Sequence, residues 1–376
     1  MKITWDRNLG NLMTFEHSKK EPVHRWFWYK EGFSPEIVDY CIGSKRPGKI
    51  LDPFCGAGTT LLAAKEKGID SIGVDASALA VFISRTKTMD YTREDIEGIK
   101  AFLSKKHRPA EGMKWEFELF SPRAAFPKRN YNQILSLRNA IEQEQGRVRD
   151  FLLLALLSVL PQASIIVKDG GVLKIKKEKR ALPAKDIFRR RAKKMLADLE
   201  SAPRGHVPGV FLGDARSLDL QDGSVDCIIT SPPYLNNIDY SKVYGLELGL
   251  LHMNKAEAGE MRMRAVRSFI GKDMEVREMP PEVGDSGRRI PIAGTYFRDM
   301  EQAIAEMFRV LAPGGKSYVV VSNSVIHETH VMVDEILAEI GERLGFESEI
   351  IVGAERIADV KPGKVKTRES MIVLQK

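Results

Sequence analysis

The chain has 376 residues, enough for one large α/β domain with insertions or for two domains, and 43% of them are hydrophobic. The formal net charge of +7 favours an anionic partner. The three cysteines include no Cys-x-x-Cys pair, so we expect neither a disulfide scaffold nor a metal site, and a reducing cytoplasm fits. The longest apolar run, residues 151–160, is roughly half of a membrane span, so we expect no membrane partner.

The first part of the chain alternates expected strands and helices. Residues 49–56 predict a buried strand that ends in a glycine turn, and residues 59–67 predict a helix that ends at Gly68. Residues 70–74 predict a second strand, and Ser77 is the expected N-cap of a helix that runs to about residue 86. This β-α-β-α order indicates a parallel sheet.

Residues 90–207 interrupt that alternation with helical periodicity and many charges. The apolar run 151–160 predicts a buried helix, bracketed by Asp150 and Pro161. Residues 168–194 hold twelve lysines or arginines against three acids, a local charge of +9 that leaves −2 for the rest of the chain. Basicity concentrated in this way is typical of a surface that contacts phosphates.

Within this basic segment, residues 184–199 predict an amphipathic helix. Its apolar stripe consists of Phe188, Ala192, Met195 and Leu199. The cations on its other faces are Lys185, Arg189, Arg190, Lys193 and Lys194. We therefore expect these five cations to bind nucleic acid, and a merely solvated helix is the alternative.

The last third of the chain returns to the α/β pattern. The expected strands are residues 210–212, 225–230, 317–321, 347–353 and 369–375, with helices at 296–310 and 331–344. We divide the chain into an N-terminal arm with the first half of the sheet (1–90), a helical basic insertion (91–207) and the second half of the sheet (208–376). The last part contains a flexible insertion at about 242–295.

The segment 52–60, DPFCGAGTT, follows the first expected strand and has the properties of a nucleoside-binding turn. Gly56 and Gly58 permit a close approach of backbone to ligand, and the helix that begins at Thr59 directs its amides there. Asp75 ends the next strand, where an acid can accept hydrogen bonds from ribose hydroxyls. A dinucleotide is the rival ligand, but it requires a third glycine where this chain has Leu61. A tight turn that binds nothing is the other alternative.

The segment 231–234, SPPY, follows another expected strand and suits a planar amine. The Ser231 hydroxyl and the Pro232 carbonyl can accept both protons of an exocyclic amino group. Pro232 and Pro233 stiffen the bend, and Tyr234 offers a stacking face. The alternative is a rigid turn or a proline-rich ligand motif. The expected strand directly before the segment argues against this alternative.

Together the two segments resemble the S-adenosylmethionine-dependent amino-methyltransferases of nucleic acids, of the cytosine-N4 type, similar to site-specific DNA methyltransferases. The resemblance implies a Rossmann-like class I fold, with a mostly parallel, seven-stranded sheet, an antiparallel last strand and helical insertions. It implies methyl transfer from S-adenosylmethionine to N4 of cytosine, with DNA ahead of a structured RNA such as ribosomal RNA. Adenine N6 remains open as the target, as does a protein that binds nucleic acid without chemistry.

The resemblance also assigns residues to roles. The implied catalytic residues are Ser231, Pro232, Pro233 and Tyr234. The implied cofactor-binding residues are Asp52, Phe54, Gly56, Ala57, Gly58, Thr59, Asp75, Asp214 and Ala215. Asp75 holds the ribose and Asp214 accepts from the adenine amino group, while the glycine turn flanks the methionine part.

Two further segments are assigned less directly. The aromatic segment 26–30, WFWYK, lies where the family places a further cofactor-contacting segment, with packing of a terminal arm as the alternative. The second insertion carries cations that can close over the substrate: Arg262, Arg264, Arg267, Lys272, Arg277, Arg288 and Arg289. Gly284 and Gly287 loosen this loop.

Overall fold

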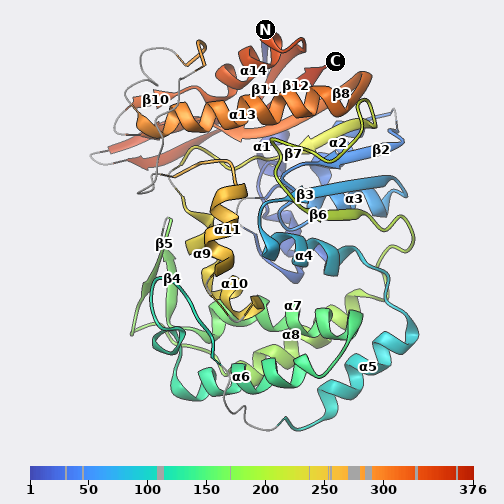
Figure 1. Cartoon of the computed structure of the whole chain (residues 1–376), viewed down its shortest axis with the longest axis vertical. Coiled ribbons are helices and arrows are strands. Elements are labelled where there is room, and N and C mark those ends of the chain that lie inside the picture. The colour runs from blue at the N-terminus through green and yellow to red at the C-terminus, as the bar shows by residue number, and fades with distance from the viewer. Residues whose placement is uncertain are drawn as a thin grey trace.

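An eight-stranded sheet forms the centre of the computed structural model, which describes residues 1–376 except 30, 31, 45, 108–113, 170, 237, 253, 255, 270–279, 284–289, 327, 328, 361 and 362. The strand order is β1-β11-β12-β8-β7-β2-β3-β6 (Figure 1). The strands are β1 (Lys2–Trp5), β2 (Lys49–Asp52), β3 (Asp70–Asp75), β6 (Gly209–Leu212), β7 (Val225–Thr230), β8 (Leu311–Ser322), β11 (Glu347–Val360) and β12 (Gly363–Gln375). The predicted positions Lys30, Lys272, Arg277, Gly284, Gly287, Arg288 and Arg289 lie outside the described residues.

The prediction of a mostly parallel sheet with an antiparallel last strand is confirmed. β12 pairs antiparallel with both of its neighbours, and every other neighbouring pair in this sheet is parallel. The count of seven strands was wrong, because residues Lys2–Trp5 add an eighth strand beside β11. This edge segment alternates polar and apolar residues but is only four residues long, and Ile3 and Trp5 are exposed, so it is not recognised before its partner is known.

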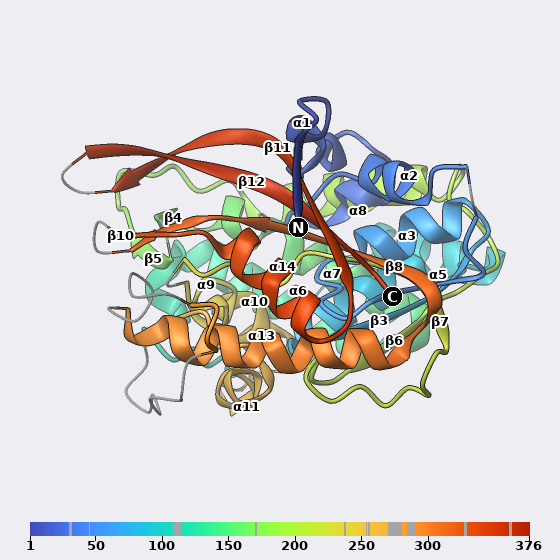
Figure 2. The same cartoon turned by 90° about the horizontal axis from the view of Figure 1, so that it is seen from above.

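Helices cover both faces of the sheet because neighbouring strand residues point to opposite sides. Ile50 packs with the helices α1 (Leu9–Leu12), α2 (Glu36–Ile42) and α3 (Thr59–Glu66), whereas Leu51 packs with α13 (Pro291–Val310) and α14 (Val333–Arg343). Figure 2 shows α13 and α14 on the side opposite α2 and α3. The helix expected after β3 is α4 (Ala78–Thr88), and the Ser77 hydroxyl accepts from the Ala80 N–H, as an N-cap should.

The expected basic insertion forms a helical lobe below the sheet in Figure 1. It contains the helices α5 (Arg93–Ser104), α6 (Lys128–Glu142), α7 (Gly146–Ala163) and α8 (Ala184–Asp198). An antiparallel hairpin of β4 (Ile166–Asp169) and β5 (Val172–Ile175) interrupts them. The prediction of helices throughout residues 90–207 did not include this hairpin. The lobe packs on α4, so it shares one hydrophobic core with that helix.

Helix α7 is longer than the sequence suggested. It begins before Asp150 and continues through Pro161 to Ala163, so the expected bracketing was wrong at both ends. Pro161 is exposed in the last turn, where a proline removes one backbone hydrogen bond and its ring meets little. The buried run from Phe151 to Leu157 supplies enough packing to maintain the helix through that defect.

The insertion expected to be flexible at 242–295 is partly a packed element. It follows α9 (Tyr240–Val243) with α10 (Gly245–His252) and α11 (Ala256–Arg264). Seven of the eight α10 residues are buried, because α10 packs against α7, α9 and α4. Among the helices that the structure describes, none combines the length and apolar character needed to cross a membrane.

Candidate active site

A cavity of about 1280 Å³, measured out to its open mouth, lies at the carboxyl ends of β2, β3 and β7. Ten residues assigned from the sequence line it: Asp52, Phe54, Gly56, Ala57, Thr59, Asp75, Ala215, Ser231, Pro232 and Pro233. The other three of the thirteen residues assigned to catalysis or cofactor binding, Gly58, Asp214 and Tyr234, are not part of that lining. The fold therefore brings the two motif turns (residues 52–60 and 231–234) to one cavity although about 170 residues separate them.

The glycine turn owes its shape to two residues with left-handed backbone. Gly56 has φ +49° and Gly58 has φ +76°, a region that favours glycine. A Cβ at Gly58 would lie 2.8 Å from Ser84 Oγ, and that hydroxyl donates to the Gly56 carbonyl at 2.8 Å. Gly58 therefore allows α4 to approach the turn, whereas Gly56 itself faces the cavity.

Asp75 connects the glycine turn to the end of β3. Its Oδ2 accepts from the Gly56 N–H at 2.8 Å and its Oδ1 accepts from the Ser77 N–H at 2.8 Å. Burial raises the pKa of this carboxyl to about 6. Each carboxylate oxygen has a second lone pair, so Asp75 can still accept from a ligand in the cavity.

Asp52 joins the two motif turns directly. Its Oδ1 accepts from the Thr230 hydroxyl at 2.6 Å and from the Phe54 N–H at 3.2 Å. Burial raises the pKa of Asp52 to about 6, although these hydrogen bonds act in the opposite direction. Thr230 is the last residue of β7 and immediately precedes Ser231, so this bond fixes one bend against the other. Sequence reasoning missed Thr230, and its position directly before SPPY was the available signal.

The bend at 231–234 exposes its first three residues to the cavity. The Ser231 hydroxyl lies 3.4 Å from the Tyr234 hydroxyl, to which it donates. Tyr234 is partly buried, and that burial raises the pKa of its phenol. Tyr234 is not among the residues that line the cavity, whereas the aromatic residues Tyr240 and Phe269 are.

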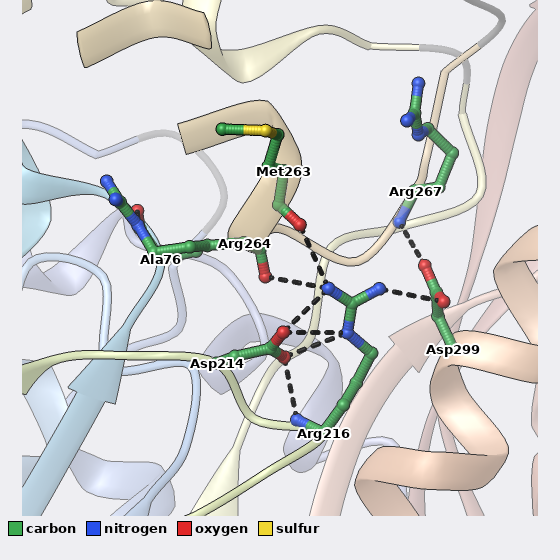
Figure 3. A network of polar contacts seen from close by, with 7 residues as sticks. All are labelled: Ala76, Asp214, Arg216, Met263, Arg264, Arg267 and Asp299. Atoms are coloured by element: carbon green, nitrogen blue, oxygen red, sulfur yellow. Dashed lines mark hydrogen bonds and ion pairs between the residues drawn. The ribbon is translucent and has the colours of Figure 1, made fainter. Parts of the chain in front are cut away.

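Asp214 is engaged by another residue of the chain (Figure 3). Its carboxylate accepts from Arg216, whose Nε lies 2.9 and 3.0 Å from the two oxygens. The same guanidinium reaches Asp299 at 2.9 Å and the Met263 carbonyl at 3.1 Å. The structure therefore gives Asp214 a part in holding residues 261–269 in place, and only its neighbour Ala215 lines the cavity.

Residues 261–269 form the C-terminal wall of the cavity, and the hydrogen bonds of Arg216 help to hold this wall in place. Arg264 donates through Nε to the Ala76 carbonyl at 3.3 Å, and the Arg267 N–H donates to Asp299 at 3.0 Å (Figure 3). Arg262 donates to Asp239 at 3.2 Å. Arg262 and Arg264 line the cavity, so two of the cations expected to close over the substrate do reach it.

Residues 15–29 form the N-terminal wall of the cavity. In the aromatic segment some side chains pack the arm onto the core, and others line the cavity. Trp26 is buried and donates through Nε1 to Asp198 of α8 at 3.0 Å, so it anchors the arm. Trp28 lines the cavity with half of its surface exposed (50%). Tyr29 stacks on Tyr244 at 4.6 Å between ring centroids.

Helix α8 presents the expected cations to solvent. Arg189, Arg190, Lys193 and Lys194 are exposed and Lys185 is half-buried, while the predicted apolar stripe is buried. The helix also reaches the cavity mouth, because the Arg191 guanidinium lies 5.9 Å from the Trp28 ring centroid. Arg191 was not among the cations assigned from the sequence.

Comparisons with known proteins agree with the resemblance stated from the sequence. A family model described as DNA methylase, of the N6/N4 type, matches residues 5–84. The chain is 27% identical over 424 residues to the Type II methyltransferase M.AvaI of Nostoc sp., covering 96% of this chain and 85% of that protein. It is 24% identical to the Type II methyltransferase M.BsoBI of Geobacillus stearothermophilus, covering 97% and 88%.

The chain also aligns with solved structures of low sequence identity. An S-adenosylmethionine-dependent methyltransferase of Methanosarcina mazei aligns with a TM-score of 0.31 and 12% identity, covering 87% of this chain and 92% of that one. A Thermus thermophilus protein complexed with S-adenosyl-L-methionine aligns with a TM-score of 0.26 and 18% identity, covering 44% and 53%. The expected resemblance, to nucleic-acid amino-methyltransferases that use S-adenosylmethionine, is confirmed by the family model and the sequence relatives.

Proposed function

We propose that this chain, which is similar to the DNA methylases of the N6/N4 type, transfers a methyl group from S-adenosylmethionine to N4 of a cytosine in DNA. The observation that carries the proposal is that the Ser231 bend and the Gly56 turn line one cavity. The Asp52–Thr230 hydrogen bond of 2.6 Å fixes their relative position. The three buried cysteines carry free thiols, which suits the cytoplasm that we expect for the enzyme.

The residues present fit the proposed cofactor. Asp75, Gly56 and Ala57 line the cavity. We assign to Asp75 the ribose hydroxyls, from which it would accept, and to the Gly56 and Ala57 backbone the methionine part. Ala76, Ala215 and the C-terminal wall (residues 261–269) line the cavity next to Asp75, and Arg264 of that wall donates to the Ala76 carbonyl, so the adenine ring would lie there beyond the ribose. We therefore assign Asp214 an indirect part in adenine binding, through Arg216 and that wall.

For this reaction the protein mainly has to hold the cytosine amine in line with the methyl group. S-adenosylmethionine supplies a methyl group on a sulfonium, which leaves as a neutral thioether when the new C–N bond forms. Cytosine N4 is a weak nucleophile because its lone pair is delocalised into the ring. The Ser231 hydroxyl and the Pro232 carbonyl would accept its two protons and so align the lone pair with the methyl group. The Ser231 hydroxyl would relay the proton released by the methylated nitrogen to water, because a hydroxyl both accepts and donates, whereas the Pro232 carbonyl only accepts a hydrogen bond.

The basic face of α8 is the proposed DNA contact. Its exposed cations would bind the phosphate backbone, a contact that carries no sequence information by itself. Arg191 and Trp28 continue that face to the cavity mouth. A cytosine in duplex DNA must leave the base stack to enter such a cavity, so the backbone contact would hold the strands while one base is extruded.

Nucleoside mass spectrometry tests the proposal. DNA and RNA are digested from cells that carry the gene, from cells that lack it, and from cells with the Ser231→Ala variant. We expect N4-methyl-2′-deoxycytidine in DNA only where the wild-type gene is present. N6-methyl-2′-deoxyadenosine in its place would overturn the choice of base, and a methylated cytidine confined to RNA would overturn the choice of polymer. If neither nucleic acid changes while the purified protein still binds DNA, the chain is a binding protein without this chemistry.

A further inference from the structure

Two buried basic side chains line the cavity without a part in the reaction described above. Lys87 of α4 is 4% exposed and His24 of the N-terminal wall is 2% exposed, and both line the cavity. The Lys87 ammonium donates to the Ala57 carbonyl at 2.8 Å, next to the glycine turn. They therefore lie beside the turn that would flank the methionine part of the cofactor.

These groups lack the partners that buried basic groups normally have. No acidic side chain forms an ion pair with Lys87 among the residues that the structure describes, and an ammonium has three protons to donate. His24 Nε2 lies 3.5 Å from the Glu66 carboxylate, an ion pair when the ring is protonated, whereas Nδ1 has no hydrogen-bond partner within the described chain. Buried polar groups without partners are costly, so they indicate a ligand that completes the site.

We propose that Lys87, with His24 beside it, recognises the carboxylate of the methionine part of S-adenosylmethionine. A carboxylate accepts from both an ammonium and an imidazole N–H, and it neutralises a buried positive charge. The amino group of the same ligand would be repelled there, so the pair also orients the cofactor. This inference rests on the proposed function, since it names a subsite for the proposed cofactor.

The surrounding charges agree with an anion at this position. Burial lowers the pKa of Lys87 to about 7, while Glu66 acts in the opposite direction. Burial also lowers the pKa of His24, and the neighbouring Lys87 charge lowers it further, against Glu66 and Glu21. Glu66 is 41% exposed at its side chain, so water screens it. Asp52, Asp75 and Asp239 also line the cavity, but among the described residues none of them forms an ion pair with Lys87 or His24.

Calorimetry without DNA separates the carboxylate from the rest of the ligand. S-adenosylmethionine and decarboxylated S-adenosylmethionine share the nucleoside, the sulfonium and the amine, and they differ only in the carboxylate. We expect Lys87→Met to weaken binding of S-adenosylmethionine by about tenfold to a hundredfold, the usual loss for a hydrogen bond to a charged group. Binding of the decarboxylated ligand should stay within about twofold, because it never made that contact.

A matched control exists in Lys65 of α3. It is also buried (3% exposed), but its ammonium pairs with Asp90 at 2.6 Å and it does not line the cavity. Lys65→Met should lower the melting temperature without changing the ratio of the two affinities. A Lys87→Met protein that weakens both ligands equally would overturn the inference and indicate a structural part for Lys87.

Proton uptake gives a second, independent measurement. At pH 8 Lys87 is mostly neutral in the free protein, because its pKa is about 7. A bound carboxylate favours the charged form, so the binding enthalpy should depend on the buffer and report uptake of up to about one proton. Lys87→Met should remove that uptake, and an uptake unchanged in the variant would contradict the assignment. If the wild-type protein binds neither ligand, the proposed cofactor itself fails, which is a different outcome.

Discussion

The two motif turns and the two cavity walls differ in how the chain specifies them. The turns, residues 52–60 and 231–234, are short continuous segments whose glycines and prolines fix their shape locally. The walls, residues 15–29 and 261–269, depend on distant partners such as Asp198 for Trp26 and Arg216 for Met263. Under the proposed function, the turns would supply the transfer chemistry, while the walls would decide what enters and how it is held.

We expect the largest effect from variants that remove the Asp52–Thr230 hydrogen bond between the two motif turns. Asp52→Ala should lower kcat by about a hundredfold, because a displacement of the bend of about 1 Å is enough for such a loss. Thr230→Val should cause a similar loss, and the double variant should be little worse than either, since both remove one hydrogen bond. Single-turnover methylation of a DNA duplex measures this; full additivity would show that the two residues act separately.

A smaller effect concerns the basic face of α8. Replacing Arg189, Arg190, Lys193 and Lys194 by Ala should reduce the slope of log affinity for DNA against log salt concentration by about 3 to 4. The control replaces four exposed strand lysines: Lys2, Lys316, Lys364 and Lys366. Fluorescence anisotropy of labelled DNA at several salt concentrations measures both variants. Equal slopes for the α8 variant and the control variant would show that DNA affinity depends on the net charge of the protein and not on this helix.

The next prediction tests whether the C-terminal wall depends on the Asp214 network. Arg216→Met removes the contacts to Asp214, Asp299 and the Met263 carbonyl, so we expect affinity for S-adenosylmethionine to fall about tenfold, in line with the loss of one charged contact. Asp214→Asn should reproduce part of this loss. If Asp214→Asn instead weakens binding while Arg216→Met does not, Asp214 contacts the adenine directly, as the sequence suggested.

The smallest expected effect is that of Tyr234→Phe. It removes only the phenol that lies 3.4 Å from the Ser231 hydroxyl, a long hydrogen bond. Turnover should fall by about threefold or less, because a neutral hydrogen bond contributes roughly 0.5–1.5 kcal/mol. Tyr234→Ala removes the packing as well and should lower turnover further, though by less than Asp52→Ala does, while cofactor binding persists. Equal turnover for wild type and Tyr234→Ala would remove this residue from the site.

The sequence predicted the sheet and the motif turns well because their signals are local. Buried strands read as continuous apolar runs, and Gly56, Gly58 and the Pro232–Pro233 pair restrict the backbone wherever they occur. The edge strand Lys2–Trp5 escaped notice because it becomes a strand only through β11. Residues Gly245–His252 were predicted as part of a flexible insertion because their sequence lacks a clear helical periodicity of apolar residues. Helix α10 is buried only because it packs against α7 and α4.

By itself, the sequence determined the glycine turn, the proline-stiffened bend and the concentration of positive charge in residues 168–194, because each depends on neighbouring residues. Only the tertiary structure decided that Asp52 reaches Thr230, that Arg216 occupies the Asp214 carboxylate, and that Lys87 and His24 face the same cavity. These pairings join residues far apart in the chain, and the free energy that selects them comes from burial and from the demand that buried polar groups find partners.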